Sequence, residues 1–312
     1  MRDVVAVTGG TGFIGGRIVR RLHHDGWHVR ALARRPDPSL PADGVEVVQG
    51  TLDDTSSLRA LIESARAVIH CAGVISAGSR SEFVRVNRDG TARLAAAVAA
   101  HSEPPRLLLI SSLAAREPAI SAYAASKLMA EEEVHQALAG KADFCIVRPP
   151  AVYGPTDRST LPIFRQLDKG VLFVPAVDSR FSLLFVEDLA EIVAQLLQGP
   201  NWDAQTVEPD DGTGGYRWSD LARIASGHLD RRVRTVPVPR FVLWLPAALG
   251  QLQGFLTRRA PKFSLGKLRE LYHSDWVCRR TGGALLPAGR PRVTFDTGFA
   301  ATLAWYRQQK WL

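Results

Sequence analysis

Short apolar runs alternate with segments of helical periodicity through the first half of the chain. Apolar runs bounded by turn residues predict strands over 4–8, 29–33, 45–49, 67–71, 107–111 and 144–148. Apolar residues that recur every three or four positions predict helices near 13–24, 55–64, 82–101 and 122–138. Because the strands are apolar on both faces, helices should cover both sides of the sheet. The pattern therefore predicts an α/β fold with a doubly wound parallel sheet.

The second half of the chain is less regular. A strand over 181–186 and a helix over 188–198 should return to the sheet, and a C-terminal helix over 299–311 should pack Leu303 and Tyr306 inward. Other expected features are a helix over 219–227, a proline-rich stretch at 236–239 and an apolar, basic region to residue 280. The expected organisation is a cofactor-binding domain over 1–154, completed by about 181–198, and a smaller C-terminal substrate-binding lobe formed by 155–180 and 199–312.

Composition narrows the class of protein. The chain has 312 residues, 46% of them hydrophobic and 22% charged, which is typical of a globular protein rather than a disordered or fibrous one. The net charge of +8 could attract nucleic acid or an anionic membrane, but the arginines are scattered, so we expect no nucleic-acid partner. Cys71, Cys145 and Cys278 stand far apart, which predicts free thiols, no metal site and a reducing, cytoplasmic compartment. The N-terminal residues lack a signal-peptide pattern, and no apolar run is long enough to span a bilayer.

The first predicted strand runs into glycines spaced G-x-x-G-x-x-G, and an amphipathic helix follows at once. Glycines allow a sharp turn and a close backbone approach to a pyrophosphate, and free N–H groups at a helix start favour an anion. The strand before the glycines and the helix after them make the pattern more specific. We therefore expect a nucleotide cofactor here, held by Gly9, Thr11, Gly12, Phe13, Ile14 and Gly15.

A tyrosine and a lysine four residues apart form the second candidate site. On a helix, Tyr123 and Lys127 share one face, so a cation could favour the phenolate and lower the tyrosine pKa. Such a tyrosine can move a proton to or from a carbonyl oxygen. Ser111 and Ser112 end a predicted sheet strand, where open α/β sheets bind ligands, and a hydroxyl there could hold the reacting oxygen. The alternative is a serine that only caps the next turn.

Three further segments complete a family pattern: residues 70–73 (HCAG), 86–91 (VNRDGT) and 148–155 (RPPAVYGP). With the glycine turn, the serines and the tyrosine–lysine pair, the chain resembles the extended short-chain dehydrogenase/reductase superfamily from residue 4 to about 190. The resemblance implies a Rossmann fold, a nicotinamide cofactor and hydride transfer. By position it makes Tyr123 the acid/base, Lys127 the group that lowers its pKa and binds the nicotinamide ribose, and Ser112 the holder of the substrate oxygen. Further cofactor contacts are expected at Leu52, Ala72, Gly73, Ser111, Tyr123, Lys127, Pro149 and Val152.

The end of the second predicted strand bears on the choice of cofactor. An acidic residue there would bind the ribose hydroxyls of NAD, but this chain has Arg34 and Arg35. Guanidinium groups can pair with the 2′-phosphate of NADP, so we expect NADP rather than NAD. The alternative is that both arginines are solvated loop charges. The family often has an aspartate at the adenine contact where this chain has Thr51, although Leu52 could still pack on the ring.

The expected lobe suggests the substrate class. Residues 236–256 are strongly apolar and are followed by Arg258, Arg259 and Lys262, which suits an interfacial segment or the mouth of a lipid-sized pocket. A core helix of the lobe would give the same pattern. Residues 261–276 have similar apolar spacing and could form a second wall. Sterol dehydrogenases and lipid 3-keto reductases of the superfamily share such lobes.

The nucleotide-sugar branch of the superfamily fits less well. Those enzymes commonly have an asparagine where this chain has Ala151, and they tend to have a longer step than the one from Ser112 to Tyr123. We therefore expect an NADP(H)-dependent oxidoreductase that interconverts a ketone and a secondary alcohol on a 3-oxo lipid or sterol-like substrate. A nucleotide-sugar epimerase or dehydratase and a non-catalytic NADP-binding scaffold or sensor are the alternatives. We also expect a homodimer through the helices near 82–101 and 122–138, and peripheral contact of 236–262 with the inner face of the membrane.

Overall fold

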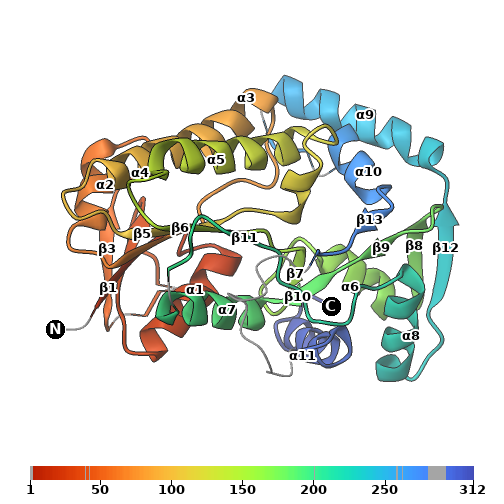
Figure 1. The fold of residues 1–312 in the computed structure, drawn as a ribbon. Coiled ribbons are helices and arrows are strands. Elements are labelled where there is room, and N and C mark those ends of the chain that lie inside the picture. The colour runs from red at the N-terminus through yellow and green to blue at the C-terminus, as the bar shows by residue number, and fades with distance from the viewer. Residues whose placement is uncertain are drawn as a thin grey trace.

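A seven-stranded parallel sheet forms the centre of the computed structural model, which describes residues 3–38, 40–41, 43–199, 201–257, 259–261, 263–279 and 293–312. The strand order is β11-β6-β5-β4-β1-β2-β3 (Figure 1). The strands are β1 (Val4–Thr8), β2 (His28–Ala33), β3 (Val45–Gln49), β4 (Ala67–His70), β5 (Arg106–Ile110), β6 (Phe144–Val147) and β11 (Thr206–Val207). The six strands predicted in the first half are confirmed to within one residue at each end.

Helices cover both faces of this sheet (Figure 1). The helices α1 (Phe13–His24) and α7 (Val186–Gln198) pack together on one face, and α2 (Thr55–Ile62), α4 (Gly90–Ala99) and α5 (Ala122–Leu138) cover the other. Each layer turns a fully buried apolar stripe toward the strands, for example Ile18 and Val193 on the first face and Leu94 and Val134 on the second. The predicted doubly wound α/β fold is therefore confirmed.

The helix expected over 82–101 consists of three pieces. After α3 (Arg80–Phe83), the chain makes a π-helical turn at Val84–Asp89 and then enters α4. Such wide turns occur mostly at functional sites. This one turns Asn87 inward, where its side chain is 2% exposed and makes hydrogen bonds in both directions with the backbone of Val74.

A second core holds the C-terminal region together. It lies between α6 (Leu161–Asp168), α8 (Trp218–Leu229) and α11 (Phe295–Gln308), and it contains the buried rings of Tyr153, Phe164, Phe295 and Phe299. Leu303 and Tyr306 face inward as predicted, at 4% and 0% exposure. Two small strand pairs flank this core: β8 (Val171–Pro175) with β12 (Arg234–Val238), and β9 (Arg180–Phe181) with β13 (Asp275–Trp276).

The strand expected over 181–186 does not join the large sheet, so that part of the expectation is wrong. It forms as β10 (Leu183–Phe185) but pairs with β7 (Ala151–Tyr153), while β11 takes the place beside β6. The reason lies after β6, where Pro149 and Pro150 lack the N–H groups needed to continue the ladder. The helix half of the expectation is confirmed, because α7 packs against α1.

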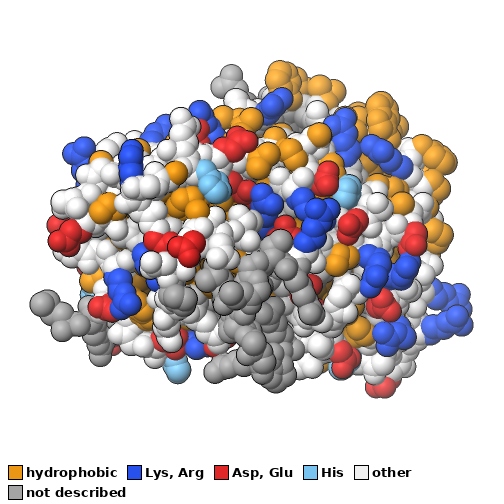
Figure 2. Space-filling view, in the orientation of Figure 1, with side chains coloured by type: hydrophobic (Ala, Val, Ile, Leu, Met, Phe, Trp, Pro, Cys, Tyr) orange, Lys and Arg blue, Asp and Glu red, His pale blue; other side chains and the backbone are white. Residues whose placement is uncertain are grey.

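The apolar segment of the C-terminal region forms α9 (Arg240–Thr257), which lies on the outside of the molecule beside α10 (Leu265–Leu271) (Figure 1). Figure 2 shows its apolar side chains at the surface. Eight of them are 50–78% exposed: Phe241, Val242, Trp244, Leu245, Leu249, Leu252, Phe255 and Leu256. The alternative of a core helix is therefore wrong. Arg258 and Lys262, expected to flank this helix, lie outside the described residues, and no described helix is long and apolar enough to cross a membrane.

Candidate functional site

The glycine turn brings the ends of β1 and β4 together at the point where the strand order reverses. Gly9 has a φ of +71°, and a Cβ on it would lie 2.6 Å from the backbone nitrogen of Ala72. A Cβ on Gly15 would lie 2.2 Å from the carbonyl oxygen of Gly9. Only glycine allows both approaches. Crevices at such a reversal are where open α/β sheets bind their ligands.

The start of α1 offers hydrogen-bond donors at this crevice. The helix follows Gly12, whose backbone is extended, and in the described structure no side chain caps it. Its first N–H groups, from Phe13 onward, have no intrahelical acceptor, which suits a phosphate. Thr11 and Gly12 are exposed and Ile14 is half-buried, so a ligand can reach the turn. The predicted phosphate residues therefore fit a dinucleotide.

A buried histidine fixes the edges of the crevice. Thr91 donates to the carbonyl of Asn87 at 2.6 Å, so its oxygen accepts from Nε2 of His70 at 2.9 Å. The other ring nitrogen, Nδ1, lies 2.6 Å from the hydroxyl of Thr8, which also accepts from the backbone of Ala72. Burial lowers the pKa of His70 to about 3, so the ring is neutral and holds β1, β4 and α4 in register.

Tyr123, Ser112 and Lys127 lie together at the end of β5. Tyr123 is half-buried in the first turn of α5, and the side chain of Ser112 faces its phenol. Burial raises the pKa of Tyr123 to about 12, and Ser112 acts to lower it. The expectation of a lowered pKa is therefore wrong for the protein alone, because desolvation outweighs the groups that stabilise the phenolate. At neutral pH Tyr123 is a phenol that can donate a proton.

Lys127 is 8% exposed and donates from Nζ to the carbonyl of Ile110 at 2.8 Å. Burial lowers its pKa to about 8, while Glu131 acts to raise it. The bond to Ile110 holds the ammonium at the carboxyl end of β5, one turn of helix from Tyr123.

The two serines have different roles. Ser112 accepts from the backbone of Ala114 at 3.2 Å and caps the short helix Leu113–Arg116, so the capping alternative is realised while Ser112 also faces Tyr123. Ser111 is 5% exposed, and its hydroxyl donates to the carboxylate of Glu131. The Ser111 side chain is thus already engaged, and its backbone N–H donates to the carbonyl of Val147 at 2.7 Å.

Sequence reasoning missed the ion-pair network behind these residues. Glu131 is 3% exposed and accepts from Arg148 at 2.6 Å and 3.0 Å. Arg148 lies 3.7 Å from Glu208, which lies 3.6 Å from Arg116, and Arg116 donates to backbone carbonyls next to β13. The network ties α5 to the C-terminal region. The spacing 123, 127, 131 could have revealed its first member, because these positions share one helix face.

The other predicted contacts lie around the same edge of the sheet. Leu52 packs beneath Gly90, where a Cβ would come within 2.7 Å of its side chain, and Gly73 lies against Asn87. Asn87 also donates to Ser126 of α5 at 2.9 Å. Pro149 is buried, and its carbonyl accepts from the backbone of Leu113. Val152 is partly buried and packs against the sheet core. Arg34 and Arg35 are exposed after β2. The predicted site residues therefore lie around the carboxyl ends of β1 to β6, except Val152, which lies within β7.

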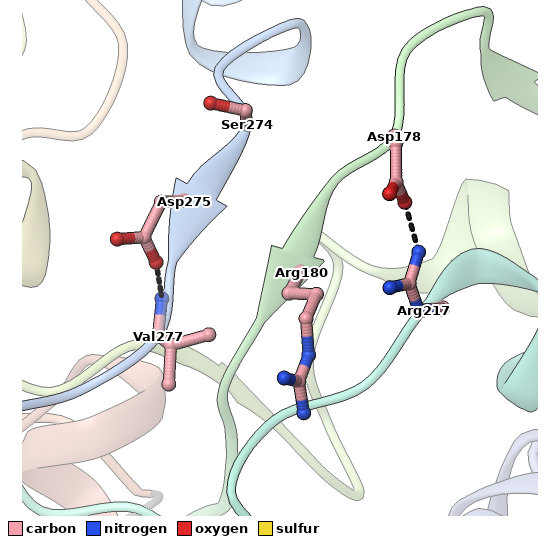
Figure 3. Close-up of a pocket in the computed structure, with 6 residues that line it drawn as sticks. All are labelled: Asp178, Arg180, Arg217, Ser274, Asp275 and Val277. Atoms are coloured by element: carbon pink, nitrogen blue, oxygen red, sulfur yellow. Dashed lines mark hydrogen bonds and ion pairs between the residues drawn. The ribbon is translucent and has the colours of Figure 1, made fainter.

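Two pockets lie away from Tyr123. One of about 380 Å³ lies between β9 and β13 and is lined by Asp178, Arg180, Arg217, Ser274, Asp275 and Val277 (Figure 3). Its charges are largely matched, because Arg217 pairs with Asp178 and Asp275 accepts from the backbone of Val277 at 3.0 Å. The other, of about 520 Å³, lies along α9 and the chain that follows it. Among the described residues no cluster of three metal-ligating side chains occurs.

Comparison with known proteins agrees with this geometry. The profile of the NAD dependent epimerase/dehydratase family matches residues 5–207. A ceramide reductase from Caulobacter vibrioides is 39% identical over 316 residues, covering 100% of this chain and 96% of that protein. Sterol demethylase protein B from Methylococcus capsulatus is 28% identical, covering 97% and 98%.

Among solved structures, a UDP-glucose 4-epimerase from Thermotoga maritima matches with a TM-score of 0.75 and 14% identity, covering 98% of this chain and 99% of that chain. At this identity the match shows the fold alone. The family match spans the strands and helices that carry the glycine turn, Ser112, Tyr123 and Lys127. The chain therefore belongs to the NAD dependent epimerase/dehydratase family and is an NAD(P)-dependent oxidoreductase of the extended short-chain dehydrogenase/reductase type.

Proposed function

We propose that the protein is an NADP(H)-dependent reductase of a lipid ketone, with a ceramide-like ketone as the first candidate and a sterol ketone as the second. The observation that carries the proposal is the placement of Tyr123 and Ser112 at the end of β5, beside the buried Lys127. The full-length similarity to a ceramide reductase supports the substrate class, as does the more distant similarity to a sterol demethylase protein.

The chain's own residues handle the oxygen of the substrate. A nicotinamide bound at this site would supply the hydride for the carbonyl carbon, and the carbonyl oxygen would need a proton. Tyr123 donates it from its phenol, and Ser112 hydrogen-bonds the same oxygen and keeps it within reach. With a tyrosine pKa of about 12, the phenol is present at neutral pH and can donate this proton. Lys127, fixed by Ile110, is placed to bind the nicotinamide ribose.

NADP is the proposed cofactor because Arg34 and Arg35 are exposed beyond β2, beside the glycine turn. Replacing both with Asp and Ser should lower kcat/KM for NADPH by at least about 100-fold, since each guanidinium–phosphate pair is worth about 1.5–3 kcal/mol. The value for NADH should change little. Steady-state kinetics of the wild type and the double variant with both cofactors test this prediction. A wild type that prefers NADH would contradict it.

A substrate panel tests the reaction. The purified protein is mixed with NADPH and, separately, with a detergent-dispersed ceramide-like ketone, a sterol ketone and a UDP-sugar. We expect NADPH oxidation with a lipid ketone. Conversion of the UDP-sugar without net NADPH consumption would support the nucleotide-sugar alternative, and NADPH binding without turnover of any ketone would support the non-catalytic scaffold.

The proposal also includes the domain division, the cellular location, the oligomeric state and a membrane contact. The division into a cofactor-binding domain over 1–154 and a C-terminal lobe is supported by their separate apolar cores. A cytoplasmic location is supported by the free thiols of Cys71, Cys145 and Cys278. A homodimer through α4 and α5 follows the family expectation, and sedimentation equilibrium would test it. Peripheral contact of 236–262 with a membrane is supported by the exposure of α9.

A further inference from the structure

We propose that α9 is a docking surface for an anionic lipid bilayer and that the lipid substrate passes from this bilayer along α10 to Tyr123. The proposal rests on the lipid-reductase function proposed above. It names the partner of α9 and the direction from which the substrate arrives.

The large apolar side chains of α9 form one continuous face. At 3.6 residues per turn, the eight exposed apolar residues cover roughly 160° of the helix circumference. A helix on the surface of a globular protein normally turns such a face toward the core. Here Phe241, Phe255 and Leu256 are 78%, 70% and 71% exposed. Exposed apolar patches of this kind mark protein or membrane interaction sites.

The opposite face of α9 is built from small residues that pack closely on the protein. Ala247 is 0% exposed, and a Cβ on Gly250 would lie 2.2 Å from the carbonyl oxygen of Phe263. A Cβ on Gly254 would lie 3.0 Å from the ring of Pro261. The helix is therefore held in place by its small face, and the outward direction of the large face is fixed by close packing.

The charge around α9 selects an anionic partner. From residue 239 to residue 263 the sequence has four cations and no carboxylate: Arg240, Arg258, Arg259 and Lys262. Arg240 and Arg259, next to the two ends of the apolar face, are exposed. Each cation near an anionic membrane adds about 1 kcal/mol of attraction. A second copy of the chain would bring like charges together, so a bilayer fits the face better than a self-association does.

The length of α9 determines how the helix can meet a bilayer. Its 18 residues measure about 27 Å along the axis. An apolar face flanked by cations is typical of helices that lie in the plane of the interface. We therefore place α9 parallel to the membrane, with Phe241 and Phe255 among the acyl chains and the arginines among the headgroups.

The next helix connects this surface to the catalytic residues. α10 packs against α9, and a Cβ on its Gly266 would lie 3.1 Å from the side chain of Ser121, the N-cap of α5. Glu270 of α10 acts on the pKa of Tyr123. The pocket of about 520 Å³ opens between α9 and the chain at 259–263. The elements α9, α10 and α5 thus follow one another from the apolar surface to Tyr123.

Vesicle binding of the full-length protein tests the docking surface. The protein is sedimented with vesicles of phosphatidylcholine alone and of phosphatidylcholine with phosphatidylglycerol. We expect binding to the anionic vesicles. The variant F241S/L245S/F255S should lower the partition at least about tenfold, and R240E/R259E by about tenfold or more, on anionic vesicles. The matched control R59E/R223E changes two exposed arginines on α2 and α8, away from α9, and should bind like the wild type.

The outcomes separate this proposal from the proposed function. Equal binding of wild type and F241S/L245S/F255S, or an equal loss in R59E/R223E, would overturn the docking surface. A concentration-dependent dimer that the apolar variant abolishes, without vesicle binding by the wild type, would overturn it in favour of a second copy. Turnover of the lipid ketone in detergent is measured in parallel. Turnover without vesicle binding defeats the docking surface alone, and vesicle binding without turnover defeats the reductase function.

Discussion

The helices α5 and α9 are almost equal in length, at 17 and 18 residues, and they distribute their side chains in opposite ways. α5 buries polar and charged residues, with Lys127 at 8% and Glu131 at 3% exposure. α9 exposes large apolar residues, with Phe241 at 78%. Both helices break the rule that apolar side chains lie inside and charges outside.

Each departure has a physical cost, and each therefore points to a role. Burying an ammonium and a carboxylate requires partners, which Ile110 and Arg148 supply. Exposing apolar surface to water is unfavourable unless something covers it. Departures from the usual pattern are expected where function requires them. The comparison separates a site that is complete within the chain from a surface that needs a partner.

The largest effect should come from removing the phenol of Tyr123. Tyr123→Phe leaves the ring in place and deletes the proton donor, so turnover should fall by about 100- to 10,000-fold while NADPH binding stays nearly unchanged. Steady-state rates and fluorescence titration with NADPH measure the two quantities. The matched control is Tyr272→Phe, which loses a hydroxyl that donates to the backbone carbonyl of Val238. Retained turnover in Tyr123→Phe would show that another group supplies the proton.

The next effect concerns stability at the other end of the same helix face. Glu131→Gln removes the charge that Arg148 pairs with, and breaking a buried pair should lower the free energy of unfolding by about 3 kcal/mol. Glu133→Gln on the same helix is the control. Its pair with Arg88 is at the surface, so the loss should stay under about 1 kcal/mol. Urea denaturation compares the two, and equal losses would mean that burial does not distinguish them.

A smaller effect should appear in the pH profile of ketone reduction. The pKa of Lys127 is lowered to about 8, so the ammonium is present below that pH and lost above it. Tyr123 keeps its proton across the same range, because its pKa is raised to about 12. The rate should therefore fall as pH rises through about 8, by up to tenfold per pH unit. Lys127→Met should abolish this limb at a lower overall rate, and a wild-type rate that rises above pH 8 would contradict the assignment.

The smallest effect is expected from α9. F241S/L245S/F255S changes only exposed side chains, so the free energy of unfolding should change by no more than about 0.5 kcal/mol. Thermal or urea unfolding without lipid measures it. A loss of several kcal/mol would mean that the face is covered within the protein, and the contrast with α5 would disappear.

The sequence predicted the cofactor half well because its signals are local. Each strand was a short apolar run, and the glycine turn, Ser112, Tyr123 and Lys127 all lie in segments whose spacing is visible in the chain. The π-helical turn at Asn87 was missed because a wide turn changes the helical period by only one residue. The network from Glu131 through Arg148 to Glu208 was missed because its members are distant in sequence and meet only in the fold.

The C-terminal region was harder for a different reason. An amphipathic helix has the same sequence pattern whether its large apolar residues face the core or solvent. The periodicity of 241–256 therefore could not show whether this face is buried or exposed. The close packing of Gly250 and Gly254 decided it, and those contacts involve the chain at 259–263. The raised pKa of Tyr123 was also beyond the sequence, because it depends on how deeply the ring is buried.

The stoichiometry of NADPH oxidation against product formation tests directly whether the protein reduces a lipid ketone. The purified protein is given NADPH and a detergent-dispersed ceramide-like ketone, and NADPH loss is compared with the secondary alcohol found by mass spectrometry. If the protein is a lipid-ketone reductase, the wild type should form equal amounts of NADP and alcohol, and Tyr123→Phe should form neither. Equal amounts of alcohol from the wild type and Tyr123→Phe would contradict the proposed role of Tyr123. Conversion of a UDP-sugar by the wild type without net NADPH loss, with the ketone unchanged, would contradict the reductase function.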